Sequence, residues 1–206
     1  MRRSLCLALA WLVPLMATAA CGPHESGPPA SPAAALTLQE YDTIGGDFAL
    51  TDDRGGPFAF ADHRGQVVLL FFGYTFCPDA CPMTLSKIAQ AMKQVGPAAS
   101  RDRVLALLVT VDPARDTPDV LREYLAHFSI PAVGLTGTSD ELDAVAGQYG
   151  ASYEPGPATS VGSATVNHST YLYLIDQRGK LRCIFRHDDG ADLIAAGLRR
   201  LLEVGT

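Results

Sequence analysis

Two uninterrupted apolar runs dominate the hydrophobic pattern of this chain. Residues 66–72 and 104–111 are rich in β-branched and aromatic side chains, which is typical of strands that are covered on both faces. The residues between these runs predict a helix, because apolar positions recur at spacings of three and four and a Gly-Pro pair follows: Leu85, Ile88, Met92, Val95, then Gly96-Pro97. A strand, a helix and a strand of this length predict a right-handed crossover between parallel neighbours.

The pattern predicts further elements downstream. Residues 171–175 and 181–185 are short apolar runs joined by a turn sequence, which predicts an antiparallel hairpin. Helices are expected at three places with capping residues or amphipathic spacing: from Thr117-Pro118, from the capping box at residues 138–141, and over residues 191–202. Two parallel strands, an antiparallel hairpin and helices for both faces predict an α/β three-layer sandwich with a mixed sheet.

The first residues of the chain have the pattern of an export signal. Arg2 and Arg3 precede an apolar run, and small residues follow it up to Cys21. The stretch at residues 18–22, TAACG, resembles a bacterial lipobox, in which the cysteine is lipidated and becomes the new N-terminus. The alternative is an ordinary signal peptide cut nearby, with Cys21 incidental. Both interpretations predict an extracytoplasmic protein, and the lipobox predicts a membrane-anchored lipoprotein of the bacterial periplasm or cell surface.

Composition divides the 206 residues into three parts. Residues 1–20 are the expected signal peptide, residues 21–40 a tether rich in Pro, Gly and Ser, and residues 41–206 one globular domain. The net charge is -6, and it becomes -8 without the two arginines of the signal peptide. This acidic balance argues against nucleic acid as a partner and against attraction to anionic lipid.

Cys77 and Cys81 follow the first apolar run, with Cys81 at the expected start of the helix. The positive end of a helix dipole favours thiolates, so we expect both thiols to ionise readily. Their spacing permits either a disulfide or a two-sulfur grip on a soft metal. A disulfide across so short a loop would contribute about 2 to 3 kcal/mol at most, so stability alone is a poor reason for the pair. The two cysteines by themselves leave a redox disulfide and a metal site open.

His168 is the expected third member of a metal site. Parallel strands end at one edge of a sheet, where α/β folds usually bind ligands, so the loops with Cys77 and Asp112 should share that edge. If residues 169–175 form a strand antiparallel to them, His168 faces the two sulfurs. Two thiolates and an imidazole suit Cu(I), whereas zinc would normally require a fourth ligand. Asn167 is a candidate to orient the imidazole.

Polar residues after the second apolar run stand beside the same edge. Asp112, Arg115 and Asp116 lie between that run and the next expected helix. They could present charge to a partner, but we expect them to pair with one another and so hold this loop beside the cysteines. An isolated surface ion pair would contribute only about 0 to 1 kcal/mol to stability.

Four separated stretches carry a family resemblance. They are FGYTFCPDACP at residues 72–82, VDPARDTP at 111–118, GLTG at 134–137, and His168-Ser169 with the YLID run that follows. In this order they resemble the Sco/SenC family of copper-binding proteins. The resemblance implies a thioredoxin-like fold and copper bound as Cu(I) by Cys77, Cys81 and His168, and it leaves open whether Cu(II) is also held. The family usually has Asp where this chain has Asn167.

The resemblance also implies a function. Family members are implicated in supplying copper to the binuclear copper centre of cytochrome c oxidase subunit II, or in reducing the cysteines of that centre. This implies a membrane-tethered copper metallochaperone, with subunit II or a similar acceptor as partner, rather than an enzyme in the turnover sense. The alternatives are a thiol:disulfide oxidoreductase acting through Cys77 and Cys81, and a redox sensor that uses the same residues.

Overall fold

The computed structural model describes residues 36–158 and 164–204. The expected signal peptide, the lipobox with Cys21 and most of the expected tether lie outside these ranges. None of the helices within the two ranges has both the length and the apolar character needed to cross a membrane.

The described residues form nine strands, four α-helices and two short 3-10 turns. The strands are β1 (Ala49–Asp52), β2 (Pro57–Ala59), β3 (Val67–Gly73), β4 (Val104–Thr110), β5 (Ala132–Thr136), β6 (Tyr153–Ala158), β7 (Ala164–His168), β8 (Leu172–Ile175) and β9 (Leu181–Phe185). The helices are α1 (Ala80–Val95), α2 (Pro118–Ala126), α3 (Ser139–Gln148) and α4 (Ala191–Val204), with short 3-10 turns η2 (Phe60–His63) and η3 (Gly96–Ala99).

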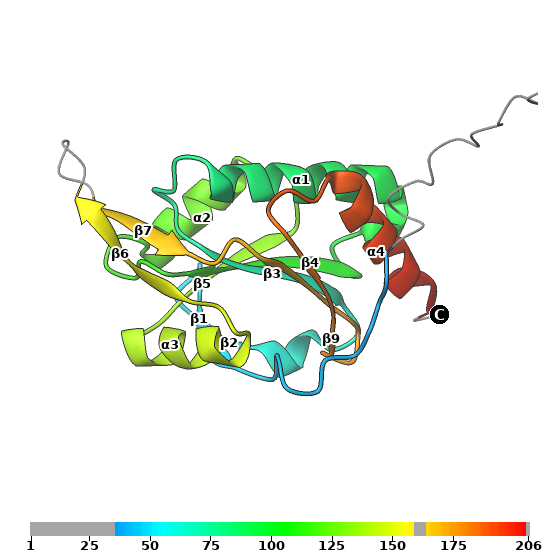
Figure 1. Ribbon diagram of the computed structural model, residues 1–206, viewed down its shortest axis with the longest axis horizontal. Coiled ribbons are helices and arrows are strands. Elements are labelled where there is room, and N and C mark those ends of the chain that lie inside the picture. Colours follow the sequence, from blue (N-terminus) through cyan, green and yellow to red (C-terminus); the bar gives the residue numbers. More distant parts are fainter. Residues whose placement is uncertain (1–35, 159–163, 205–206) are drawn as a thin grey trace, which may run out of the picture. The chain divides into compact units, whose positions relative to one another are not determined.

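A mixed seven-stranded sheet has the strand order β2-β1-β5-β4-β3-β8-β9 (Figure 1). Strands β3, β4 and β5 are parallel, while β1 and β8 run antiparallel to their neighbours in this set. The register pairs Gly73 with Thr110, so β3 and β4 end side by side and their loops share one edge. The predicted parallel pair, hairpin and sandwich class are confirmed, whereas β1, β2 and β5 were not predicted.

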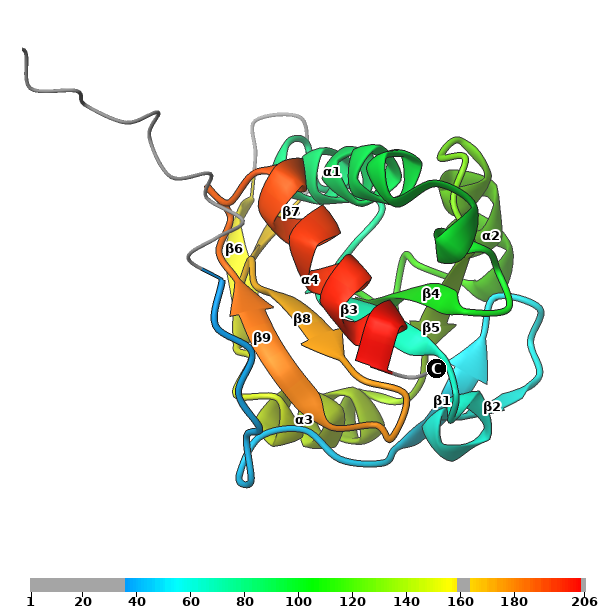
Figure 2. The same ribbon diagram turned by 90° about the vertical axis from the view of Figure 1, so that its right-hand side faces the viewer.

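Helices lie on both faces of this sheet. Helices α1, α2 and α4 cover one face and α3 with η2 covers the other, and Figure 2 shows α4 running beside α1. In β3, Leu69 and Phe71 pack into the first layer while Leu70 and Phe72 pack into the second. Every residue of β3 and β4 is buried, so polar and apolar residues do not alternate in these strands and their sequences are nearly continuous apolar runs.

Strand β5 was not predicted from the sequence because it is short and contains a glycine. A β-carbon on Gly134 would come within 2.7 Å of the Leu121 β-carbon, so the glycine lets α2 approach the strand closely. Strand propensity is low at such a position, although tertiary packing requires this residue there.

The chain that leads into the domain packs along the edge strand β9. Leu36 is buried in the layer of α1 and α4, and the main-chain N–H groups of Gln39 and Tyr41 donate to the carbonyl oxygens of Arg182 and Leu181. This pairing covers the hydrogen-bonding groups of an otherwise open sheet edge. The residues from Leu36 onward therefore pack against the expected domain.

Strands β6 and β7 form a separate two-stranded sheet. Tyr153 is paired with His168 and Glu154 with Asn167 across it. The sequence predicted a strand over residues 171–175 and left a start at residue 169 as a condition; β8 begins at Leu172, and His168 is the last residue of β7. The start at residue 169 is not met, because the segment before β8 pairs locally with β6 instead of extending the main sheet.

Candidate metal centre

Three elements bring Cys77, Cys81 and His168 together. Cys77 lies in the loop between β3 and α1, Cys81 is in the first turn of α1, and His168 ends β7. One donor atom from each lies within 4.8 Å of the others, and Cys81 Sγ is 3.8 Å from His168 Nε2. The helix begins at Ala80, so Pro82 is its third residue rather than its first, and Cys81 still lies at its N-terminus.

The two cysteines are free thiols with opposite pKa shifts. The hydrogen bond from the Cys81 thiol lowers the pKa of Cys77 to about 3, and His168 and the N–H groups of Asp79 and Cys81 reinforce this against the effect of burial. The pKa of Cys81 is raised because it donates to Cys77, is buried and faces the charge on Cys77. The pair therefore shares one proton at neutral pH.

The expectation that both thiols ionise readily is wrong for Cys81. The N–H of Cys81, at the start of α1, donates to the sulfur of Cys77 at 3.5 Å. The N-terminus of α1 thus stabilises the thiolate of Cys77 in the preceding loop, whereas Cys81, inside the helix, keeps its proton.

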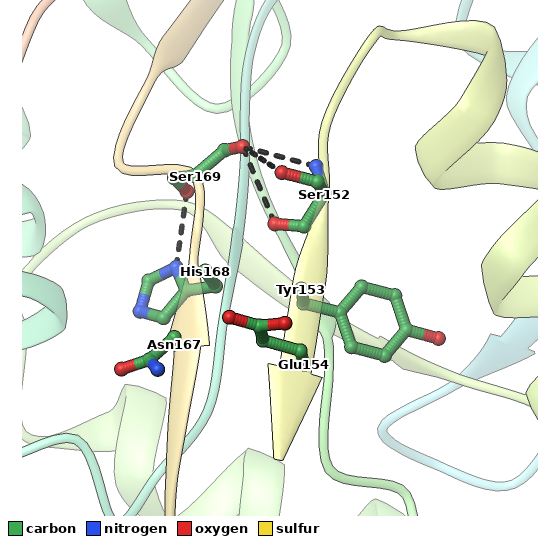
Figure 3. Close-up of a pocket in the computed structure, with 6 residues that line it drawn as sticks. All are labelled: Ser152, Tyr153, Glu154, Asn167, His168 and Ser169. Carbon is green, nitrogen blue, oxygen red and sulfur yellow. Dashed lines mark hydrogen bonds between the residues drawn. The ribbon is translucent and has the colours of Figure 1, made fainter. Parts of the chain in front are cut away.

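The imidazole of His168 is oriented by its own neighbour in the chain. Its Nδ1 lies 3.0 Å from the carbonyl oxygen of Ser169 (Figure 3). A carbonyl only accepts, so Nδ1 donates its proton to Ser169, and Nε2 is the ring nitrogen on the side of Cys81 that is available to a metal ion. Asn167 was the expected orienting residue, but it is exposed and the carbonyl of Ser169 has this role.

A buried carboxylate fastens the cysteine loop to the end of β4. Asp116 is fully buried and accepts hydrogen bonds from the Thr75 N–H at 3.1 Å, the Thr75 hydroxyl at 2.6 Å and the Thr110 hydroxyl at 2.6 Å. Burial raises the pKa of Asp116, and these hydrogen bonds oppose the rise. Asp112 and Arg115 form the expected ion pair, but Asp116 bonds to the two threonines instead.

The site opens to the surface on the side of the hairpin and at the cysteine loop. A cavity of about 430 Å³ lies beside His168, lined by Ser152, Tyr153, Glu154, Asn167, His168 and Ser169 (Figure 3). In the cysteine loop, Phe76 is 58% exposed, and the Arg115 guanidinium lies 5.1 Å from the centre of its ring. Cys183 lies elsewhere, buried in strand β9, and burial raises its pKa to about 11.

Sequence reasoning missed several residues that support this site. Tyr74 and Thr75 stand inside the stretch that carries the family resemblance, and both bond to segments far along the chain. Asp116 was expected at the site but with different partners. The signal that could have pointed to Thr75 is a hydroxyl residue two positions before a cysteine at a strand end, which is too common to be specific.

Comparison with known proteins assigns the family. The SCO1/SenC family model matches residues 37–203. The human mitochondrial protein SCO1 homolog is 36% identical over 155 residues, 75% of this chain and 52% of the human protein, so the chain spans about half of that relative.

Two solved structures with copper bound are similar to this chain. ScoI of Bradyrhizobium japonicum is 36% identical with a TM-score of 0.68, over 77% of this chain and 99% of that one. Yeast Sco1 is 31% identical with a TM-score of 0.66, over 78% of this chain and 87% of that one. The fold is the thioredoxin-like fold of these proteins. The protein belongs to the SCO1/SenC family.

Proposed function

We propose that this protein is an extracytoplasmic copper metallochaperone that binds one Cu(I) through Cys77, Cys81 and His168. The observation that carries the proposal is the convergence of two sulfurs and an imidazole nitrogen of His168 within 4.8 Å. Thiolate and imidazole ligands suit Cu(I). The copper bound by the similar ScoI of Bradyrhizobium japonicum and by yeast Sco1 supports the same metal here.

The donor set favours Cu(I) over zinc. The cluster has three members among the His, Cys, Asp and Glu residues of the described ranges, and structural zinc sites almost always have four ligands. Cys77 is already a thiolate, so only the proton of Cys81 has to leave when the ion binds.

The acceptor that we propose is the binuclear copper centre of cytochrome c oxidase subunit II. Transfer by ligand exchange requires that acceptor ligands reach the ion. The partial exposure of Cys77 and the cavity beside His168 support such access. A lipid on Cys21 would keep the domain at the membrane, which the pattern of residues 18–22 supports.

Anaerobic Cu(I) titration of the reduced domain tests the binding proposal. We expect one copper per chain, loss of binding in Cys77→Ser and Cys81→Ser, and at least about tenfold weaker binding in His168→Ala. His127→Ala is the matched control, because His127 is exposed at the end of α2 and bonds only to main-chain oxygens there. Unchanged binding in either serine variant would contradict the proposal.

Mixing the copper-loaded domain with a purified soluble fragment of subunit II tests delivery. Copper should leave this protein and be bound by the fragment, with two copper-loaded domains consumed for each binuclear centre. Retention of copper by this protein, with a reduced and competent acceptor, would contradict delivery while leaving the binding proposal intact.

A second candidate function is reduction of the acceptor cysteines, which the low pKa of Cys77 beside the Cys81 thiol favours. The Cys77 thiolate would attack the acceptor disulfide and release one acceptor sulfur, which takes up a proton. Cys81 would then lose its proton and attack the Cys77 sulfur, which releases the second acceptor thiol and leaves a Cys77–Cys81 disulfide. His168→Ala separates the two functions, because exchange needs only the sulfurs. A redox sensor would use the same residues.

A further inference from the structure

We infer that Tyr74 is a positioning residue that sets where His168 stands relative to the two sulfurs. This inference rests on the proposed copper site. Tyr74 directly follows β3 and is buried, with 2% of its surface exposed. Its hydroxyl accepts a hydrogen bond from the N–H of Val166 in β7 at 3.2 Å. Its ring meets the imidazole of His168 edge-on, with centres 5.8 Å apart and planes at 86°.

The main chain of the same residue supports both cysteines. The carbonyl oxygen of Tyr74 accepts the N–H of Cys77 at 3.2 Å. The main-chain N–H of Tyr74 donates to the sulfur of Cys81, which by itself lowers the pKa of that thiol. One residue therefore contacts all three members of the candidate metal centre or the strand that carries them.

The hairpin β6–β7 needs such a tie because it stands apart from the main sheet. An isolated two-stranded hairpin is marginally stable in water at best. Two further hydrogen bonds of the hairpin do not reach the cysteines: the Tyr153 hydroxyl donates to Asp143 in α3 at 2.5 Å, and Ser152 bonds to Ser169 across its base. The bond from Val166 joins β7 to Tyr74, which lies between β3 and the cysteine loop.

The Tyr74 ring is itself held on a second side. The Arg115 guanidinium lies 5.8 Å from the centre of the ring, and Arg115 is ion-paired with Asp112. The guanidinium and the imidazole hold the ring in one orientation. The Tyr74 side chain therefore loses little further conformational entropy when its hydroxyl bonds to Val166. The hydroxyl can then fix β7 and with it Nε2 of His168.

Tyr74→Phe tests this role because it keeps the ring and the main-chain contacts and removes only the hydroxyl. In the reduced, copper-free protein, we expect the Val166 amide to exchange faster with solvent and the imidazole NMR signals of His168 to shift. Cu(I) affinity should fall about 10- to 100-fold, as for other groups that orient a metal ligand.

A double-mutant cycle shows whether Tyr74 acts through His168. In a His168→Ala background, Tyr74→Phe should weaken Cu(I) binding no further. Tyr173→Phe is the matched control, because Tyr173 is also buried but its hydroxyl has no hydrogen-bond partner among the described residues. It should bind Cu(I) as the wild type does.

Two outcomes would overturn the inference. One is wild-type affinity together with wild-type Val166 exchange in Tyr74→Phe. The other is an equal loss of affinity with and without His168, which would mean that the hydroxyl acts on the sulfurs. If the wild type failed to bind Cu(I), the proposed function would fall, while Val166 exchange and the His168 signals would still decide whether Tyr74 holds the hairpin.

Discussion

Gly73 and Cys81 lie so close together that a β-carbon on Gly73 would be 2.6 Å from the Cys81 sulfur. The same β-carbon would stand 3.2 Å from Leu108 and 3.3 Å from Phe71, so it has no free direction to move. The glycine that ends β3 is thus required by the sulfur packed against it, and its φ is not in the left-handed region.

Gly73→Ala should damage the site and the fold together. The added methyl group would push the Cys81 sulfur away from its partners, so we expect Cu(I) affinity to fall at least about tenfold and stability to fall by about 1–3 kcal/mol. Cu(I) titration and urea unfolding measure the two effects. Gly147→Ala in α3 is the control, because no atom of the part of the chain that the structure describes would lie within 4 Å of the added β-carbon, and it should leave Cu(I) affinity unchanged. Wild-type behaviour of Gly73→Ala would contradict the packing argument.

Cys77 should react as a thiolate far below the usual pH of a thiol. Its pKa of about 3 means that the ionised fraction stays near one as the pH falls from 8 to 5. The alkylation rate of Cys77 by iodoacetamide should therefore be nearly constant over this range, whereas an ordinary thiol would slow about tenfold per pH unit.

Two further cysteine measurements act as controls for this prediction. Cys81→Ala removes the hydrogen bond that is the largest cause of the shift, so it should raise the Cys77 pKa and restore a pH-dependent rate. Cys183 should stay unmodified in the folded protein, because it is buried. A Cys77 rate that falls steeply below pH 8 in the wild type would show that the thiolate is not stabilised.

Removal of the Asp116 carboxylate should loosen the cysteine loop. Asp116→Ala leaves the Thr75 N–H and the Thr110 hydroxyl without their acceptor in a buried region. Such unsatisfied groups predict a loss of about 2–4 kcal/mol in the free energy of unfolding, measured in urea. Asp119→Ala, in the exposed first turn of α2, should change stability by less than about 1 kcal/mol. Equal losses of stability in the two variants would contradict the conclusion that the buried Asp116 carboxylate holds the cysteine loop.

Phe76 should matter for transfer rather than for binding. The ring is exposed next to Cys77, and exposed aromatic side chains held in place often anchor protein partners. Phe76→Ala should slow copper transfer to the subunit II fragment about tenfold or more at limiting concentrations, with unchanged Cu(I) affinity. Val204→Ala is the control, because Val204 is also an exposed apolar residue but lies at the end of α4. Transfer at the wild-type rate in Phe76→Ala would exclude the ring as an anchor.

The elements of the core were predictable because their signals are local. Strands β3 and β4 are continuous apolar runs since both faces are covered, and the caps at Thr117 and Thr138 form hydrogen bonds within their own first turns. Cys77 and Cys81 come from one short loop, so their proximity also follows from the chain itself.

Other features of the site were decided only by the tertiary structure, because they depend on contacts between distant segments. The hydroxyl of Tyr74 meets Val166 from 92 positions away, and Thr75 meets Asp116 from 41 positions away. Contacts between distant segments also decide which cysteine keeps its proton and where the hairpin that carries His168 lies. Hydrogen bonding and burial at these points exist only once the sheet has brought the segments together, so no spacing along the chain encodes them separately.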